Sequence, residues 1–156
     1  MTGRDALSDA WDHPDPHLLY TRVEPGDMDG LNHTNNAVYV KWCEQVAWSH
    51  SVSLGLDLKR YRALDRAMAI TYSEFHYLQA SRSGDEVAVA TWIVDWDRRL
   101  TMNRNFQVIR VDDGATLLRA AMRFACIELS TGRPRRLPPE FIDGYGPAVL
   151  ADPGAK

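Results

Sequence analysis

The order of apolar and polar positions predicts a short strand followed by one long helix. Residues 17–25 (HLLYTRVEP) have the composition of a short strand, which ends at a Pro-Gly pair. Residues from about 35 to 54 carry apolar side chains at helical spacing, with Val38, Trp42 and Val46 among them. Because further apolar residues fill much of the circumference, we expect this helix to lie in the core and to be buried on most sides.

The second half of the chain has the alternating pattern of β-structure. After a short helical or loop segment at residues 57–66, four strands are predicted, at residues 67–79, 86–95, 100–108 and 118–126. Turn sequences (SGD and DDG) suggest that the first two strands form a hairpin and that all four form an antiparallel meander. A basic turn (TGRPRR) and a short segment that begins with proline (PPEFIDGYG) follow. A curved sheet wrapped around one helix, in the α+β class, satisfies this order.

Length and composition set limits on the class of protein. The chain has 156 residues, of which 45% are hydrophobic, and this suits a single domain. We expect the domain to span residues 17–150, with flexible tails at 1–16 and 151–156. No apolar run approaches the roughly 20 residues that a membrane span needs, and the N-terminus lacks the apolar core of a signal peptide. We therefore expect no membrane insertion.

Charge and cysteine content narrow the choice further. Cys43 and Cys126 follow no metal-binding or redox spacing, so a reducing cytoplasm is the expected location. The formal net charge of −3 argues against a nucleic-acid partner bound through a diffuse positive field. Within the 18 basic residues, however, arginine greatly outnumbers lysine.

The polar connection before the long helix carries the chemical signal. Within ten residues it holds Asp27, Asp29, Asn32, His33, Asn35 and Asn36. A helix N-terminus presents unpaired N–H groups and the positive end of its dipole, which can stabilise an oxyanion. A carboxylate beside it could activate water or attack a carbonyl group. The pattern therefore favours an acyl-transfer site.

Three other interpretations use the same residues. Asp, Asn, Thr and His are also the residues of an ordinary turn and helix cap. A calcium loop is excluded, because Leu31 and Val38 stand where an EF-hand requires oxygen ligands. A transition-metal site of Asp27, Asp29 and His33 would lack a second histidine or a cysteine at ligand spacing.

The connection and the start of the helix resemble a known family. The run DMDGLNHTNNAVYVKWCE, residues 27–44, closely resembles the D-x-D-x-x-G-H-V-N-N-x-x-Y-x-x-W-x-E segment of hotdog-fold acyl-CoA thioesterases, the group that includes 4-hydroxybenzoyl-CoA thioesterase. The likeness extends over roughly residues 17–145 and includes DWDRR and TGRPRRLPPEF. It implies the hotdog fold, an antiparallel curved β-sheet wrapped around one long central helix.

The resemblance also implies roles for individual residues. Asp29 maps onto the catalytic carboxylate, which would act as nucleophile or as general base. The backbone N–H at or near Asn36 would polarise the thioester carbonyl, and Asn35, His33 and Tyr39 would contact the oxyanion or substrate.

Two departures from the family pattern affect these assignments. Asn32 replaces the usual glycine, and asparagine can still adopt a left-handed conformation at small cost. A related branch has a catalytic histidine where this chain has Asn36, so that chemistry does not transfer. Asp27 is expected to orient the loop.

Residues outside the loop are expected to have structural or substrate-binding roles. We expect Cys43 to act as a small hydrophobe and Glu44 to be solvated. The two arginine turns suit the phosphates of coenzyme A through bidentate hydrogen bonds, although ordinary solvated turns would look the same. They contain Arg98 and Arg99 in one turn, and Arg133 and Arg135 in the other.

The sequence therefore predicts a thioesterase that hydrolyses an acyl thioester of coenzyme A or of an acyl-carrier protein, with no metal and no cofactor. Dehydration or hydration of acyl thioesters is disfavoured, because the glycine- and proline-rich motif of those enzymes is missing. The resemblance implies a homodimer or homotetramer, since one sheet leaves an open edge. A non-catalytic acyl-CoA binding or sensing module is the alternative.

Overall fold

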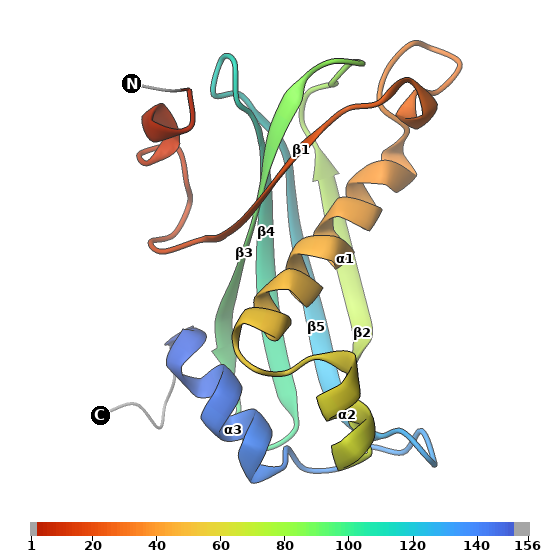
Figure 1. Cartoon of the computed structure of the whole chain (residues 1–156), viewed down its shortest axis with the longest axis vertical. Helices are drawn as coiled ribbons and strands as arrows, with labels where there is room; N and C mark the ends of the chain where they lie inside the picture. The colour runs from red at the N-terminus through yellow and green to blue at the C-terminus, as the bar shows by residue number, and fades with distance from the viewer. Residues whose placement is uncertain (1–2, 152–156) are drawn as a thin grey trace. The chain divides into compact units, whose positions relative to one another are not determined.

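The computed structural model describes residues 3–151, and their elements follow the predicted order (Figure 1). The helices are α1 (Asn36–Ser53), α2 (Leu58–Leu64) and α3 (Pro139–Tyr145). The strands are β1 (His17–Arg22), β2 (Arg66–Tyr77), β3 (Glu86–Trp96), β4 (Thr101–Arg110), β5 (Thr116–Glu128) and β6 (Val149–Ala151). Single 3-10 turns occur at η1 (Asp5–Leu7), η2 (Pro25–Asp27) and η3 (Gly146–Ala148). The predicted long helix is confirmed to within one residue at each end.

The strands form a six-stranded sheet in the order β1-β3-β4-β5-β2, with β6 paired in parallel to β3. The meander is confirmed for β3, β4 and β5, but the predicted hairpin between β2 and β3 is wrong. β3 pairs instead with β1, antiparallel, in a register that places Leu19 opposite Val89. After β2, the N–H of Leu78 donates to the carbonyl of Leu117 at 2.9 Å, which keeps the chain at β5 before it crosses to β3.

Contacts divide the chain into two compact units, and several elements have residues in both. The first unit contains Met1–Ala47, Phe75–Thr91 and Phe106–Ala120, and the second contains Trp48–Glu74, Trp92–Asn105 and Ala121–Lys156.

Helix α1 is buried along one stripe only. Tyr39, Trp42, Cys43 and Val46 are at most 4% exposed, at the spacing of one helical face. The residues between them, at 41, 44 and 45, are exposed. The expectation of burial on most sides is therefore wrong, because the apolar residues Ala37 and Val52 are exposed and Val38 and Val40 are only half-buried. The solvated position expected for Glu44 is confirmed.

The N-terminal segment is packed within the first unit, so the flexible tail expected over residues 1–16 is wrong for residues 3–16. Leu7 is 2% exposed and lies in a cluster with Ala88, Ile109 and Val111. The backbone at residues 10 and 12 exchanges hydrogen bonds of 3.0 and 2.9 Å with the buried side chain of Gln107. These polar and apolar contacts cannot be predicted from the N-terminal sequence alone, because their partners lie far along the chain.

The other expected boundaries stay predictions. Of the tail expected over residues 151–156, Ala151 ends β6 and the rest lies outside the described residues.

Candidate active site

The connection between β1 and α1 begins with a turn that Asp27 closes. The carboxylate of Asp27 accepts a hydrogen bond of 2.9 Å from the N–H of Glu24, which completes a capping box around η2. The carbonyl of Asp27 accepts one of 2.8 Å from the N–H of Asn35 at the far end of the loop. Asp27 therefore orients the loop, as the sequence predicted.

Asp29 lies at the middle of the loop with its side chain exposed to solvent. One carboxylate oxygen, Oδ1, accepts hydrogen bonds from the N–H of His33 at 3.0 Å and of Leu31 at 2.8 Å. The N–H of Asp29 donates to the carbonyl of His33 at 2.7 Å. Hydrogen bonds from the backbone N–H groups, first that of His33, hold the pKa of Asp29 below its ordinary value. Asp29 is therefore an ionised carboxylate at neutral pH.

A left-handed residue allows this tight loop. Asn32 has a φ of 62°, so asparagine here adopts the conformation that glycine adopts more easily, as expected. Its N–H donates to the carbonyl of Asp29 at 3.3 Å.

The first turn of α1 leaves one N–H group open. The side-chain oxygen of Asn35 caps the helix by accepting the N–H of Ala37 at 3.0 Å, and the carbonyl of Asn35 accepts that of Val38 at 2.9 Å. Within residues 3–151, the N–H of Asn36 donates no hydrogen bond. This N–H and the positive end of the helix dipole are therefore available to an anionic oxygen.

The remaining loop candidates differ in accessibility. His33 is half-buried and holds Asp29 through its backbone. Asn35 is exposed, but its side-chain oxygen is used by the cap. Tyr39 is only 3% exposed, and its hydroxyl lies 2.8 Å from Oγ of Ser81. The structure therefore gives the predicted substrate contact of Tyr39 no support and makes this residue an internal support of the site.

Ser81 was not predicted from the sequence. It is fully buried and contacts both Thr34 of the loop and Tyr39 of α1. The sequence around it (SRSGD) indicates only a turn, and its partners lie 47 and 42 residues away.

Backbone hydrogen bonds in the second unit bring the two arginine turns together. The N–H of Leu137 donates to the carbonyl of Arg99 at 2.8 Å, so the segment after Arg135 runs beside the first turn. Arg99 and Arg133 are exposed. Arg135 is also exposed, but it forms an ion pair with Glu128. The sequence alone did not show that the two turns are neighbours.

Asp97 fixes the turn that carries Arg98 and Arg99. Its Oδ1 accepts the N–H groups of Arg99, Leu100 and Thr101 at 2.8, 2.8 and 3.0 Å. Partial burial raises the pKa of Asp97, but these donors outweigh it and lower the pKa to about 2. Arg98 adopts a left-handed φ of 61°, and its guanidinium lies 5.9 Å from the centre of the Trp96 ring. The conformation of this surface turn is thus fixed by specific hydrogen bonds.

The structure does not support a cysteine nucleophile at Cys43 or a metal site in the loop. Cys43 is fully buried, and burial raises the pKa of its thiol to about 12, which suits a small hydrophobe. Within residues 3–151, no group of three His, Cys, Asp or Glu side chains is arranged to hold a metal ion, so the set Asp27, Asp29 and His33 does not form one.

Fold and family agree on the class of this protein. Residues 23–144 match the family model of the thioesterase-like superfamily. Because this match covers most of the chain, the chain belongs to that superfamily. Its fold is the hotdog fold, as the resemblance implied.

Solved structures share this fold at low sequence identity. SAV2348 of Staphylococcus aureus, solved in complex with CoA, superposes with a TM-score of 0.80 at 20% identity, over 91% of this chain and 89% of that one. Slr0204, a 1,4-dihydroxy-2-naphthoyl-CoA thioesterase from Synechocystis, has a TM-score of 0.73 at 18% identity, over 81% and 93%. A 12:0-ACP thioesterase from Umbellularia californica has a TM-score of 0.78 at 18% identity, over 89% and 55%.

A relative in sequence is Protein THEM6 from Danio rerio, which is 30% identical over 82 residues. The match covers 53% of this chain and 40% of that protein, so the chain spans less than half of its relative's length. None of the helices in the described residues is both long and apolar enough to cross a membrane.

Proposed function

We propose that this protein hydrolyses an acyl thioester of coenzyme A or of an acyl-carrier protein, with Asp29 as the catalytic group. The observation that carries the proposal is an ionised, solvent-open carboxylate at Asp29 on the loop that leads to an open N–H at Asn36, the first residue of α1. Membership of the thioesterase-like superfamily supports the same reaction.

Either role of Asp29 gives the same products. As nucleophile, its carboxylate attacks the thioester carbon, the thiolate leaves and takes a proton from solvent, and water then hydrolyses the acyl-aspartyl anhydride. As general base, Asp29 takes a proton from water while that water attacks the thioester carbon; the C–S bond then breaks, and the leaving thiolate takes the proton from Asp29. In both routes the N–H of Asn36 donates to the carbonyl oxygen as negative charge develops on it. The products are a free acid and a thiol.

The phosphates of coenzyme A are proposed to bind the neighbouring arginine turns, with Arg98, Arg99, Arg133 and Arg135 as the donors. Support comes from the backbone contact between the turns and from the exposure of Arg99 and Arg133. The structural neighbours include a protein in complex with CoA and a 12:0-ACP thioesterase, so both carriers stay within the proposal.

A homodimer or homotetramer in the cytoplasm completes the proposal. Strand β2 ends the strand order, and Ile70 and Tyr72 on it are 46% and 54% exposed. An edge strand with apolar exposed residues is suited to pairing with a second copy. The cytoplasmic location is supported by the two free, buried cysteines.

The test is thiol release from a panel of acyl-CoAs and acyl-carrier proteins by the wild type and by Asp29→Asn. Asn keeps the hydrogen-bonding oxygen of the loop but removes the charge, so we expect a loss of about a hundredfold or more. Asp57→Asn is the matched control, because Asp57 is an exposed carboxylate that caps α2 through the N–H of Arg60 at 2.8 Å. It should keep full activity.

The same experiment tests the alternative of a non-catalytic acyl-CoA binding module. Equal, background release by the wild type and Asp29→Asn, with acyl-CoA bound by both, would establish the binding module and refute the thioesterase.

A further inference from the structure

Three buried hydroxyl groups connect the candidate loop to the chain between β2 and β3. Oγ of Ser81 lies 2.6 Å from Oγ1 of Thr34 and 2.8 Å from the hydroxyl of Tyr39. The N–H of Thr34 also donates to the carbonyl of Ser81 at 2.9 Å. All three residues are at most 3% exposed. Ser81 therefore contacts both the end of the loop and the first turns of α1.

This connection lies one residue from the groups that hold Asp29. Thr34 follows His33, whose N–H donates to the Asp29 carboxylate and whose carbonyl accepts the N–H of Asp29. It also forms an isolated antiparallel bridge with Met28, on the other side of Asp29. On its other flank, Thr34 precedes the helix cap, Asn35. A displacement of Thr34 therefore moves the carboxylate and the start of α1 relative to each other.

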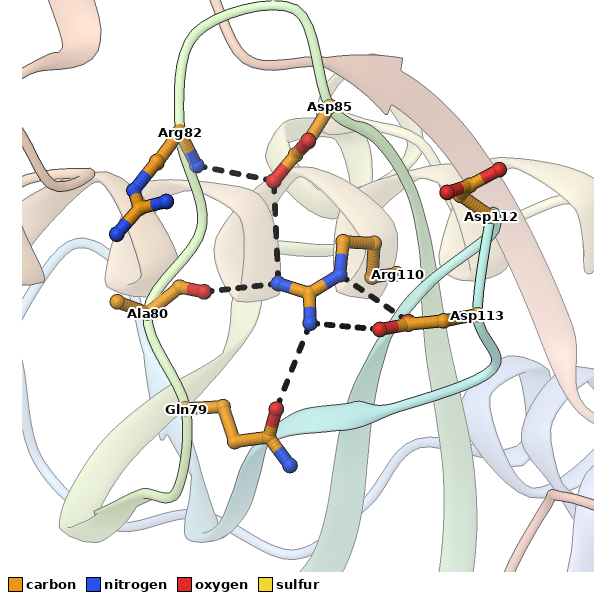
Figure 2. A pocket seen from close by; sticks show the side chains of 7 residues that line it. All are labelled: Gln79, Ala80, Arg82, Asp85, Arg110, Asp112 and Asp113. Atoms are coloured by element: carbon orange, nitrogen blue, oxygen red, sulfur yellow. Dashed lines mark hydrogen bonds and ion pairs between the residues drawn. The ribbon is translucent and has the colours of Figure 1, made fainter.

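The segment that carries Ser81 is itself braced by Arg110, as Figure 2 shows. Nη1 of Arg110 donates to the carbonyl of Ala80 at 2.9 Å, directly before Ser81. Nε and Nη2 hold the carboxylate of Asp113 at 3.1 and 2.8 Å, and Nη2 also lies 3.4 Å from the side-chain oxygen of Gln79. With Nη1 3.9 Å from the carboxylate of Asp85, the guanidinium is directed at protein acceptors on every side.

The hollow around Arg110, about 540 Å³ in volume, therefore has its central cation already bound by the protein. Arg110 acts there as a brace for the segment at residues 79–85, which fixes the place of Ser81.

We propose that Ser81 is a positioning residue for the hydrolysis proposed above. Through Thr34 and Tyr39 it holds the Asp29 carboxylate and the open N–H of Asn36 in the arrangement that the thioester requires. The proposal rests on the proposed function, because positioning is defined by the reaction. A misplacement of about 1 Å in such a site can lower a rate about a hundredfold.

Ser81→Ala tests the proposal, with Ser51→Ala as a matched control. Ser51 is also a buried serine, 5% exposed, whose Oγ lies 2.9 Å from a tyrosine hydroxyl, that of Tyr145. Both variants lose a buried hydroxyl contact, so both should lose similar thermal stability. We expect Ser81→Ala to lower kcat roughly ten- to a hundredfold with KM within about twofold, and Ser51→Ala to keep kcat within about twofold. Equal losses of kcat in the two variants would overturn the proposal.

Amide hydrogen exchange on the same samples provides a readout independent of activity. Ser81→Ala should speed exchange at residues 28–36 and Ser51→Ala should not. Unchanged exchange in Ser81→Ala overturns the proposal whatever the activity, and so does faster exchange with unchanged kcat.

If the wild type releases no thiol from any thioester, the proposed function fails and the positioning role with it. Exchange then reports separately whether the hydroxyl contacts exist. If Ser81→Ala does not fold, Tyr39→Phe removes one hydroxyl of the same cluster and should lower kcat by a smaller factor, and unchanged kcat in that variant would overturn the proposal.

Discussion

Truncation of Leu7 to alanine tests whether the N-terminal segment belongs to the folded core. Leu7 is 2% exposed and packs with Ala88, Ile109 and Val111, of which the first two are fully buried. A buried Leu→Ala change costs roughly 2 to 5 kcal/mol, depending on how far the surroundings close the gap. A segment near a chain end can move into the gap, so we expect about 2 to 3 kcal/mol, at the lower end of that range.

Urea denaturation followed by tryptophan fluorescence measures this loss, and a thermal melt should show Tm lower by roughly 4 to 12 °C. Leu58→Ala is the control, because Leu58 is 51% exposed and its truncation should change stability by less than about 0.5 kcal/mol. A Leu7→Ala variant as stable as Leu58→Ala would show that the segment is not docked in solution. The predicted flexible tail would then be correct.

The remaining predictions concern the site and the edge of the sheet. Because backbone N–H groups lower the pKa of Asp29 below 3.8, the active carboxylate persists as pH falls, and kcat/KM should still exceed half its maximum at pH 3.8, with folding checked by circular dichroism. A half-maximum near pH 6 would exclude Asp29 as the titrating group. Arg99→Ala and Arg133→Ala should each raise KM for acyl-CoA about tenfold or more, since a hydrogen bond to a charged group contributes about 1.5 to 3 kcal/mol. Hydrolysis of the matching N-acetylcysteamine thioester, which has no phosphates, should not change, and an equal effect on both substrates would contradict a phosphate contact. Tyr72→Lys places a charge on the exposed edge of β2 and should reduce the particle mass in light scattering to that of one chain, whereas a monomeric wild type would refute the oligomer.

The sequence predicted the elements well but paired two strands wrongly, for a physical reason. The turn at residues 83–85 does form, with the N–H of Asp85 donating to the carbonyl of Arg82 at 3.0 Å. Turn residues act locally, whereas the partner of a strand depends on which faces can be buried. β3 is buried at every position from Val87 to Ile93, as a central strand is, while β2 is exposed over most of its second half. That contrast, rather than the turn between them, indicates that β2 lies at the edge.

In the candidate site, too, the features that depend on local contacts could be predicted and those that depend on distant contacts could not. The roles of Asp27 and Asn32 involve hydrogen bonds and backbone angles within the loop, so the resemblance of the loop to the family motif was sufficient to predict them. The anchor at Ser81 and the adjacency of Arg99 to the second arginine turn depend on the folded chain, and no pattern around those residues indicates them. Tyr39 matched the family motif, but its side chain is buried and its hydroxyl contacts Ser81.

The hydrogen bonds of Asp29 bear on its role in the reaction. Because Oδ1 accepts two backbone N–H groups, Oδ2 is the oxygen available to attack carbon or to take a proton. A carboxylate with a lowered pKa is a weak base for water at neutral pH, whereas a nucleophile only has to be ionised. General-base catalysis would therefore require bound substrate to exclude water and raise the pKa of Asp29. In that case the acid limb of kcat, which reports the enzyme–substrate complex, lies at higher pH than that of kcat/KM. If Oδ2 itself attacks the thioester carbon, the acid limbs of kcat and kcat/KM need not lie at different pH values.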